Sequence, residues 1–215
     1  MRNTDVVDSA LDDPMNDVLD NELADIAITT DSDVLLRPLE ARNPAGSAVN
    51  GRNGAVIRRG YLTLNSTAFA DGGAIPMQYT CDGANQPPPL SWEDVPEGTR
   101  SFALIVHDPD APKGDYTHWV LFDLPATTQQ LTGGPGETPF GLTGTNDFGD
   151  IGYGGPCPPP GHGPHHYQFD LYALDTDQLN LVRGARRSEV ESAVRGHILA
   201  ETTLQGIYER QGSAD

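Results

Sequence analysis

Apolar residues follow a strand-like pattern through the second, larger part of the chain. Residues 101–107 (SFALIVH) are apolar on both faces, which is typical of a central buried strand. In residues 167–174 (YQFDLYAL), every second position is aromatic or apolar, so we expect one face of a strand to meet a core. Similar patterns predict further strands over residues 61–64, 118–124 and 200–208.

One helix is predicted near the end of the chain. Ser188 and Glu191 have the spacing of a capping box, and Val190, Val194 and Ile198 form an apolar stripe at helical spacing. Many strands followed by a late helix favour a mainly β fold over a repeated strand–helix–strand arrangement.

The first 58 residues differ from the rest of the chain. They contain no aromatic residue and no cysteine, and residues 42–54 have the Gly, Asn and Pro content of a linker. Residues 15–28 show a weak helical periodicity. We interpret residues 1–58 as an acidic, flexible extension, with a docking segment for a partner as the alternative, and residues 59–212 as the folded domain.

The charge of the chain limits its partners and suggests its environment. The formal charge is −18, and Lys113 is the only lysine beside twelve arginines. Such a surface suits a cytosol at high salt, where the Debye length falls to about 3 Å near 1 M. We therefore expect a halophilic, cytoplasmic protein. Nucleic acid and anionic membranes are disfavoured partners because both are polyanions.

Two further sequence features bear on location and on cross-linking. No apolar run approaches the roughly 20 residues that span a bilayer, and residues 1–23 lack the pattern of a secretory signal. Cys81 and Cys157 are the only cysteines. We expect two free thiols, with a bridge between them as the alternative.

Polar residues that could carry chemistry concentrate in three segments at the ends of predicted strands. The first is residues 107–112 (HDPDAP), where prolines stiffen a turn that holds Asp108 and Asp110. The alternative is a plain turn in which both carboxylates accept local backbone N–H groups. The second segment is residues 117–119 (THW), where His118 is either functional or simply packed beside a tryptophan.

The third segment is the long stretch of residues 149–167 (GDIGYGGPCPPPGHGPHHY). Gly154 and Gly155 allow backbone N–H groups to approach an anion closely, and the following prolines keep the loop extended. A lid or a linker is the alternative. His165 and Tyr167 follow this loop directly, which favours a binding role.

Several motifs together resemble the phosphatidylethanolamine-binding protein family, in its bacterial and archaeal Raf-kinase-inhibitor-like branch. They are DPDAP (residues 108–112), HW (118–119) and GYGGPCPPPGHGPHHYQFDLYALD (152–175), supported by shorter matches in residues 69–92 and 146–149. The resemblance runs from about Leu62 to Arg210. It implies a large antiparallel sheet, a second smaller sheet and a helix in the C-terminal region.

The resemblance also implies a shallow pocket for phosphate, phosphorylated head groups or similar anions. Carried over by position, the ligand-binding residues are Asp108, Asp110, His118, Gly155, Pro156, His165 and Tyr167. His166 departs from the family pattern, which often has arginine there, and His107 is a second departure. No cofactor is implied. A kinase or protease as a protein partner and a homodimer are expectations by analogy.

From these residues we predict a small-anion-binding protein with a regulatory or inhibitory role, and no enzymatic activity. If Asp108 contacts His118 or His165, it should raise the pKa of that histidine, so that an imidazolium, the Tyr167 hydroxyl and the Gly155 N–H hold the anion. A hydrolase that uses Asp108, His118 and His165 is one alternative. The other is a metal site drawn from His107, Asp108, Cys157, His162, His165 and His166.

Overall fold

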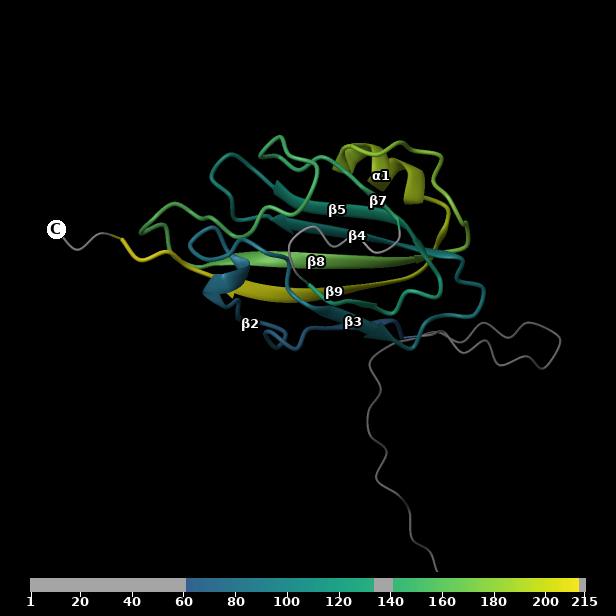
Figure 1. Ribbon diagram of the computed structural model, residues 1–215, viewed down its shortest axis with the longest axis horizontal. Coiled ribbons are helices and arrows are strands. Elements are labelled where there is room, and N and C mark those ends of the chain that lie inside the picture. Colours follow the sequence, from purple (N-terminus) through teal and green to yellow (C-terminus); the bar gives the residue numbers. More distant parts are fainter. Residues whose placement is uncertain (1–60, 134–140, 213–215) are drawn as a thin grey trace, which may run out of the picture. The chain divides into compact units, whose positions relative to one another are not determined.

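Two β-sheets and one α-helix form the part of the chain that the structure describes (Figure 1). The structure, a computed structural model, describes residues 61–133 and 141–212. The large sheet contains β2 (Gly73–Ala74), β4 (Ser101–Asp108), β5 (Tyr116–Pro125), β7 (Leu142–Thr143), β8 (His165–Leu174) and β9 (Ile198–Tyr208). The small sheet contains β1 (Thr63–Asn65), β3 (Leu90–Glu93) and β6 (Gln130–Leu131). The helices are the 3₁₀ turn η1 (Met77–Tyr79) and α1 (Arg187–Val194).

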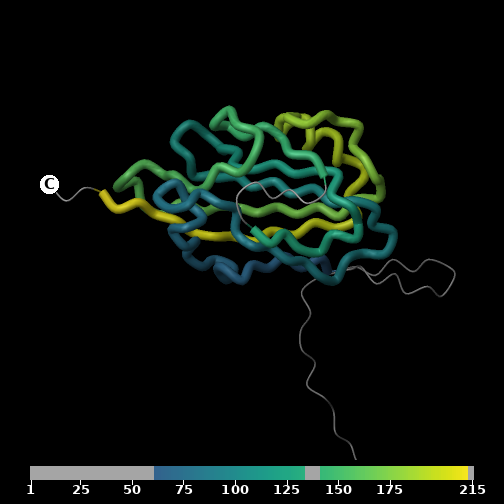
Figure 2. The backbone as a smooth tube through the Cα atoms, viewed as in Figure 1, coloured from purple at the N-terminus to yellow at the C-terminus, as the bar shows by residue number. Residues whose placement is uncertain are grey.

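The order of the strands puts the most apolar segment in the middle of the large sheet. That order is β2–β9–β8–β4–β5–β7, and β1–β3–β6 form the other sheet. All eight residues of β4 are buried, as its unbroken apolar sequence predicts. Long antiparallel ladders join β4 to β5 and to β8, and Figure 2 shows β8 and β9 running side by side. The two-residue β2 is an exception because it pairs with β9 in parallel.

Each face of the large sheet has its own core. Buried and half-buried residues alternate along most of β8, so Tyr167, Phe169 and Leu171 face the first core, which also contains Leu64 and Trp92 of the small sheet. On the opposite face, side chains of β4 and β5 pack against buried residues of α1. The mainly β fold with two sheets and a late helix is therefore confirmed.

The predicted capping box of the helix is displaced by two residues. Arg186 is the N-cap, and its backbone N–H donates to the Glu189 carboxylate over 2.8 Å. Glu191 instead pairs with Arg187 one turn away. Gly196, with a φ of +88°, follows the helix, and Ile198 already belongs to β9 and is 39% exposed. The predicted apolar stripe is thus correct for Val190 and Val194 but wrong for Ile198.

The predicted extension, residues 1–58, and its weak helical segment lie outside the described residues. In the ranges that are described, no helix is long and apolar enough to cross a membrane.

Candidate functional site

Asp108 and His165 meet at one end of the large sheet. Asp108 ends β4 and His165 begins the neighbouring antiparallel strand β8. The His165 Nδ1 lies 2.6 Å from Asp108 Oδ2, and both side chains are almost fully buried. The second carboxylate oxygen of Asp108 accepts the backbone N–H of Asp110 over 2.9 Å. Asp108 thus makes the local turn that the sequence offered as one alternative and also contacts a histidine of the predicted site.

Asp110 lies on the rim of this site and faces His166. One of its carboxylate oxygens accepts the backbone N–H of His166 over 2.9 Å and contacts the ring Nδ1 at 2.7 Å. These hydrogen bonds from His166 lower the pKa of the exposed Asp110 carboxyl. His166, which stands where arginine was expected, is therefore bound to a carboxylate at the surface.

His118 is buried beside Tyr167 and is bonded to the loop that crosses in front of it. Its Nδ1 lies 2.7 Å from the Gly154 carbonyl oxygen, and its ring stands edge-to-face to Tyr167 with centroids 5.1 Å apart. Because a carbonyl can only accept, Nδ1 carries the hydrogen, and Nε2 is an acceptor in the neutral ring.

The expected imidazolium at His118 is wrong. Burial lowers the pKa of His118, and this effect outweighs the hydrogen bonds to the Gly154 and Gly155 carbonyls and the charge of Asp108. Asp108 contacts His165 instead of His118. His118 is therefore a neutral ring near pH 7.

Tyr167 is the buried group between the two histidines. Its side chain is fully buried on β8, and its ring is stacked with that of His165 at a centroid distance of 6.4 Å. Burial first, and then the nearby Asp108 carboxylate, raise the pKa of the Tyr167 hydroxyl far above its usual value. This hydroxyl meets no hydrogen-bond partner of adequate geometry among the described residues.

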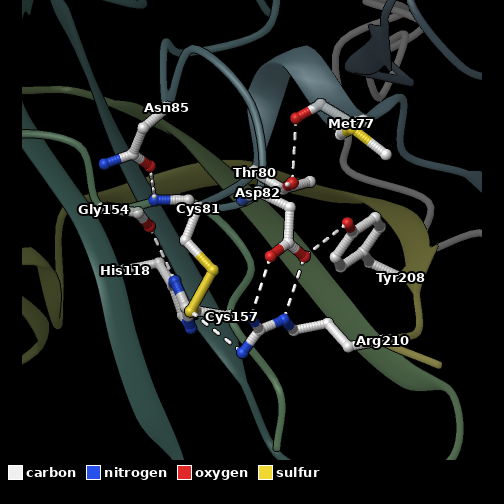
Figure 3. The surroundings of a disulfide bond; sticks show 11 residues. Met77, Thr80, Cys81, Asp82, Asn85, His118, Gly154, Cys157, Tyr208 and Arg210 are labelled. Atoms are coloured by element: carbon white, nitrogen blue, oxygen red, sulfur yellow. Dashed lines mark hydrogen bonds and ion pairs between the residues drawn. A yellow bond between two sulfur atoms is a disulfide. The ribbon is translucent and has the colours of Figure 1, made fainter. Parts of the chain in front are cut away.

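The glycine–proline loop is held from behind by a segment that sequence reasoning did not include in the site (Figure 3). The Gly155 N–H donates to Asn85 Oδ1 over 2.8 Å, and the Pro156 carbonyl accepts the Cys81 N–H over 3.1 Å. A Cβ on Gly155 would lie 2.5 Å from the Tyr79 carbonyl oxygen, so glycine is required by this close approach. The predicted role of the Gly155 N–H as an anion donor is wrong, because Asn85 already takes it.

Cys81 and Cys157 form a disulfide, so the expectation of two free thiols is also wrong. The bond joins the segment after η1 to the loop that bonds His118, across 76 residues of sequence. Cys157 is exposed and Cys81 half-buried. Sequence separation could not reveal this contact, because the sheet brings the two segments together only in the folded chain.

His162 is a second residue of the site that the ligand-binding prediction missed. Its Nδ1 lies 2.8 Å from His165 Nε2, and the two rings are 5.0 Å apart. The one sequence signal for His162 is its position three residues before His165, in the loop that was predicted to have a binding role.

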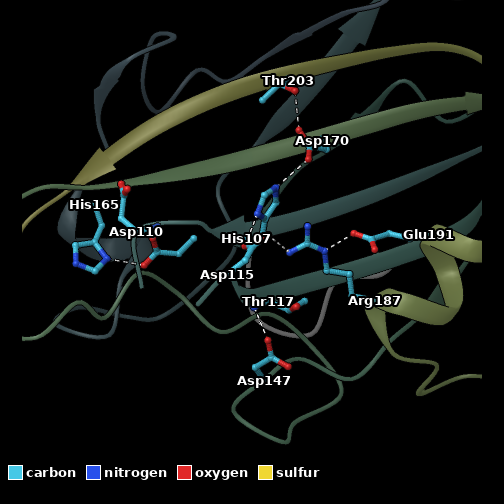
Figure 4. A network of polar contacts seen from close by, with 11 residues as sticks. His107, Asp110, Asp115, Thr117, Asp147, His165, Asp170, Arg187, Glu191 and Thr203 are labelled. Carbon is cyan, nitrogen blue, oxygen red and sulfur yellow. Dashed lines mark hydrogen bonds and ion pairs between the residues drawn. The ribbon is translucent and has the colours of Figure 1, made fainter. Parts of the chain in front are cut away.

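His107 belongs to a separate polar network on the helix-covered face of the sheet (Figure 4). Its Nδ1 lies 2.6 Å from Asp115 and its Nε2 3.0 Å from Asp170, while Asp115 also pairs with Arg187 of α1. Burial and the charge of Arg187 act to lower the pKa of His107, but the hydrogen bonds to Asp170 and Asp115 prevail and raise it. Because carboxylates can only accept, the ring donates from both nitrogens when both contacts are made and then carries a positive charge.

The predicted alternative metal set is not assembled. His107 faces the other side of the sheet from Asp108, and Cys157 is consumed in the disulfide. Across residues 61–133 and 141–212, no group of three or more His, Cys, Asp or Glu side chains is placed to hold a metal ion. Of the three residues in the hydrolase alternative, Asp108 and His165 are in contact with each other, whereas His118 is hydrogen-bonded to the loop.

Comparison with known proteins agrees with this fold. The family model for phosphatidylethanolamine-binding protein matches residues 65–209. The UPF0098 protein of Aquifex aeolicus is 50% identical over 152 residues, which cover 69% of this chain and 89% of that protein. The UPF0098 protein of Pyrococcus horikoshii is 46% identical over 151 residues, covering 68% and 76% respectively.

Solved structures show the same relationship. The YbcL structure of Escherichia coli, described as a member of the mammalian PEBP family, has a TM-score of 0.66 and 33% identity over 70% of this chain and 99% of that one. The structure of the homologue CT736 from Chlamydia trachomatis has a TM-score of 0.66 and 38% identity over 71% and 99%. The protein therefore belongs to the phosphatidylethanolamine-binding protein family.

Proposed function

We propose that the site around Tyr167 binds a small phosphate-type anion. The observation that carries this proposal is the buried, unpartnered Tyr167 hydroxyl between two histidine rings. A buried donor without a partner is costly, and native proteins keep such groups mostly where a ligand or water completes them. The other unpartnered buried group in the described part, the Trp92 indole N–H, lies in the apolar core and has no histidine beside it.

The charges around the site favour an anion that brings its own proton. Asp108 is close enough to Tyr167 to influence its pKa, so a dianion there would be repelled. His118 is neutral and offers Nε2 as an acceptor, whereas Tyr167 offers a donor. A singly protonated phosphoryl group matches both, because its O–H can donate to His118 while another oxygen accepts from Tyr167.

Replacing Tyr167 with phenylalanine tests this assignment directly. We expect the variant to bind inorganic phosphate more weakly by about 1.5–3 kcal/mol, roughly tenfold to hundredfold, because a hydrogen bond to a charged ligand is lost. Its free energy of unfolding should stay the same or rise, because an unsatisfied buried hydroxyl is removed. Isothermal titration calorimetry and urea unfolding measure the two quantities.

The matched control is Tyr172→Phe. Tyr172 lies five residues further along β8, at a half-buried position of the alternation, whereas Tyr167 is at a buried one. Tyr172 packs with the helix-side core, so this variant should bind phosphate like the unchanged protein. Equal phosphate affinity in Tyr167→Phe and Tyr172→Phe would contradict the proposed site.

The remaining expectations stay proposals. They are the inhibition of a kinase or a protease, the homodimer and the absence of catalysis. The proposed cytoplasmic location now has an argument against it, because a disulfide is typical of oxidising compartments and rarer in a reducing cytosol. Alkylation of the protein in freshly lysed native cells would show which state it has there.

A further inference from the structure

In this structure His165 has no free hydrogen-bonding atom. Its Nδ1 contacts the Asp108 carboxylate at 2.6 Å, and its Nε2 contacts His162 Nδ1 at 2.8 Å. An imidazole ring has only these two polar atoms. An anion bound at Tyr167 that also contacts the neighbouring His165 ring must therefore displace one of these two partners.

The two partners differ greatly in how easily they can leave. The side chains of Asp108 and His165 are 4% and 2% exposed, so parting them would leave a buried carboxylate without its partner. His162 is exposed, and its ring can regain hydrogen bonds from water when it turns away. His162 is thus the partner that an incoming ligand can replace.

The backbone around His162 allows its ring to leave without disturbing the loop. The His162 N–H donates to the Pro159 carbonyl, and the preceding Gly161 N–H donates to the Arg210 carbonyl. Gly161 and Gly163 both have positive φ values, +75° and +92°, so the turn on each side of His162 is already accommodated by glycine. A rotation of the side chain alone separates the two rings.

We propose that His162 occupies the ligand's place on His165 Nε2 and that an anion binds by displacing it. This proposal rests on the proposed function, because it takes the anion bound at Tyr167 and adds a contact to His165. The exchange replaces a bond between two rings with a charge-assisted bond to an anion, which is stronger. This bond needs a hydrogen on Nε2, and the Asp108 carboxylate on Nδ1 keeps the ring oriented toward the ligand. His162 therefore competes with every ligand for His165 Nε2, and weak hydrogen-bond acceptors do not displace it.

Replacing His162 with alanine gives a result opposite to that for a ligand-contacting residue. Without the competing ring, we expect inorganic phosphate to bind roughly two- to tenfold more tightly, the equivalent of one ordinary hydrogen bond. His162→Gln retains a side chain that can bond to Nε2, so its affinity should lie between those of His162→Ala and the unchanged protein. His197→Ala is the control, because His197 pairs with Asp175 in an exposed contact and should leave phosphate affinity unchanged.

Nitrogen NMR provides a second readout that does not depend on affinity. The ¹⁵N coupling across the His162–His165 hydrogen bond should be present without phosphate and disappear at saturation. Weaker or equal phosphate binding by His162→Ala, or a coupling that survives saturation, overturns the displacement proposal. Absence of phosphate binding in the unchanged protein and in both His162 variants overturns the proposed function as well.

Discussion

Replacing His107 with leucine is expected to lower the free energy of unfolding by about 3 kcal/mol. Removing one partner of a buried ion pair typically costs about 3–5 kcal/mol, because a charge is left buried without compensation. The lower end applies here, since Asp115 is 41% exposed and keeps Arg187, while Asp170 keeps the Thr203 hydroxyl. Urea unfolding measures the difference.

The matched control is again His197→Ala. The His197–Asp175 pair is about half exposed on both sides, and such surface pairs contribute only about 0–1 kcal/mol. Similar losses of unfolding free energy in the His107 and His197 variants would contradict the buried network.

The pH dependence of this loss follows from the directions of the pKa shifts. The pKa of His107 is raised in the fold, so its contribution is fully present below about pH 6.5 and is lost as pH rises through the raised value. Burial opposes the shift of Asp170, but hydrogen bonds to His107 and Thr203 lower its pKa, so its contribution is lost only at strongly acidic pH. The difference between unchanged protein and His107→Leu should therefore shrink in alkaline solution.

Removing the disulfide is expected to have an effect of similar size. A bond that closes a loop across 76 residues restricts the unfolded chain strongly, and about 4 kcal/mol of stability is the corresponding value. The double variant Cys81→Ser/Cys157→Ser should lose this amount, measured by urea or thermal unfolding. Using both substitutions avoids a free thiol that could form cross-links between molecules.

Reductant supplies the control for the disulfide. It should destabilise the unchanged protein about as much as the double substitution does, and it should leave the double variant unaffected, because no other cysteine exists. Two thiols open to alkylation in the purified, oxidised protein would show that the bond is absent.

The strands were predictable from the sequence because their patterns are local. The unbroken apolar run of β4 and the alternation in β8 reflect which faces are buried, and each pattern lies within a few neighbouring residues. The motifs at the ends of these strands suggested that Asp108 could contact His118 or His165, and the structure shows the contact with His165. The helix start was misplaced because two acidic residues, Glu189 and Glu191, both fit a capping role by spacing.

The rest of the site depends on contacts between distant segments, which no local pattern contains. Asn85 reaches Gly155 across 70 residues, and Cys81 reaches Cys157 across 76. The charge of His118 could not be predicted either, because its pKa depends on how deeply the fold buries the ring. Burial thus changed the predicted donor into an acceptor.

The measurement that tests the proposed binding most directly is the affinity for N-acetyl-O-phosphoserine amide at pH 7 and pH 8. The free phosphoryl group loses its second proton near pH 6, and the pKa of His118 is lowered. Above pH 7, both groups are therefore unprotonated before they bind, although the complex needs one proton between them. Calorimetry should show binding that weakens about tenfold over this pH unit. No binding at either pH, or equal affinity at both, would contradict the account.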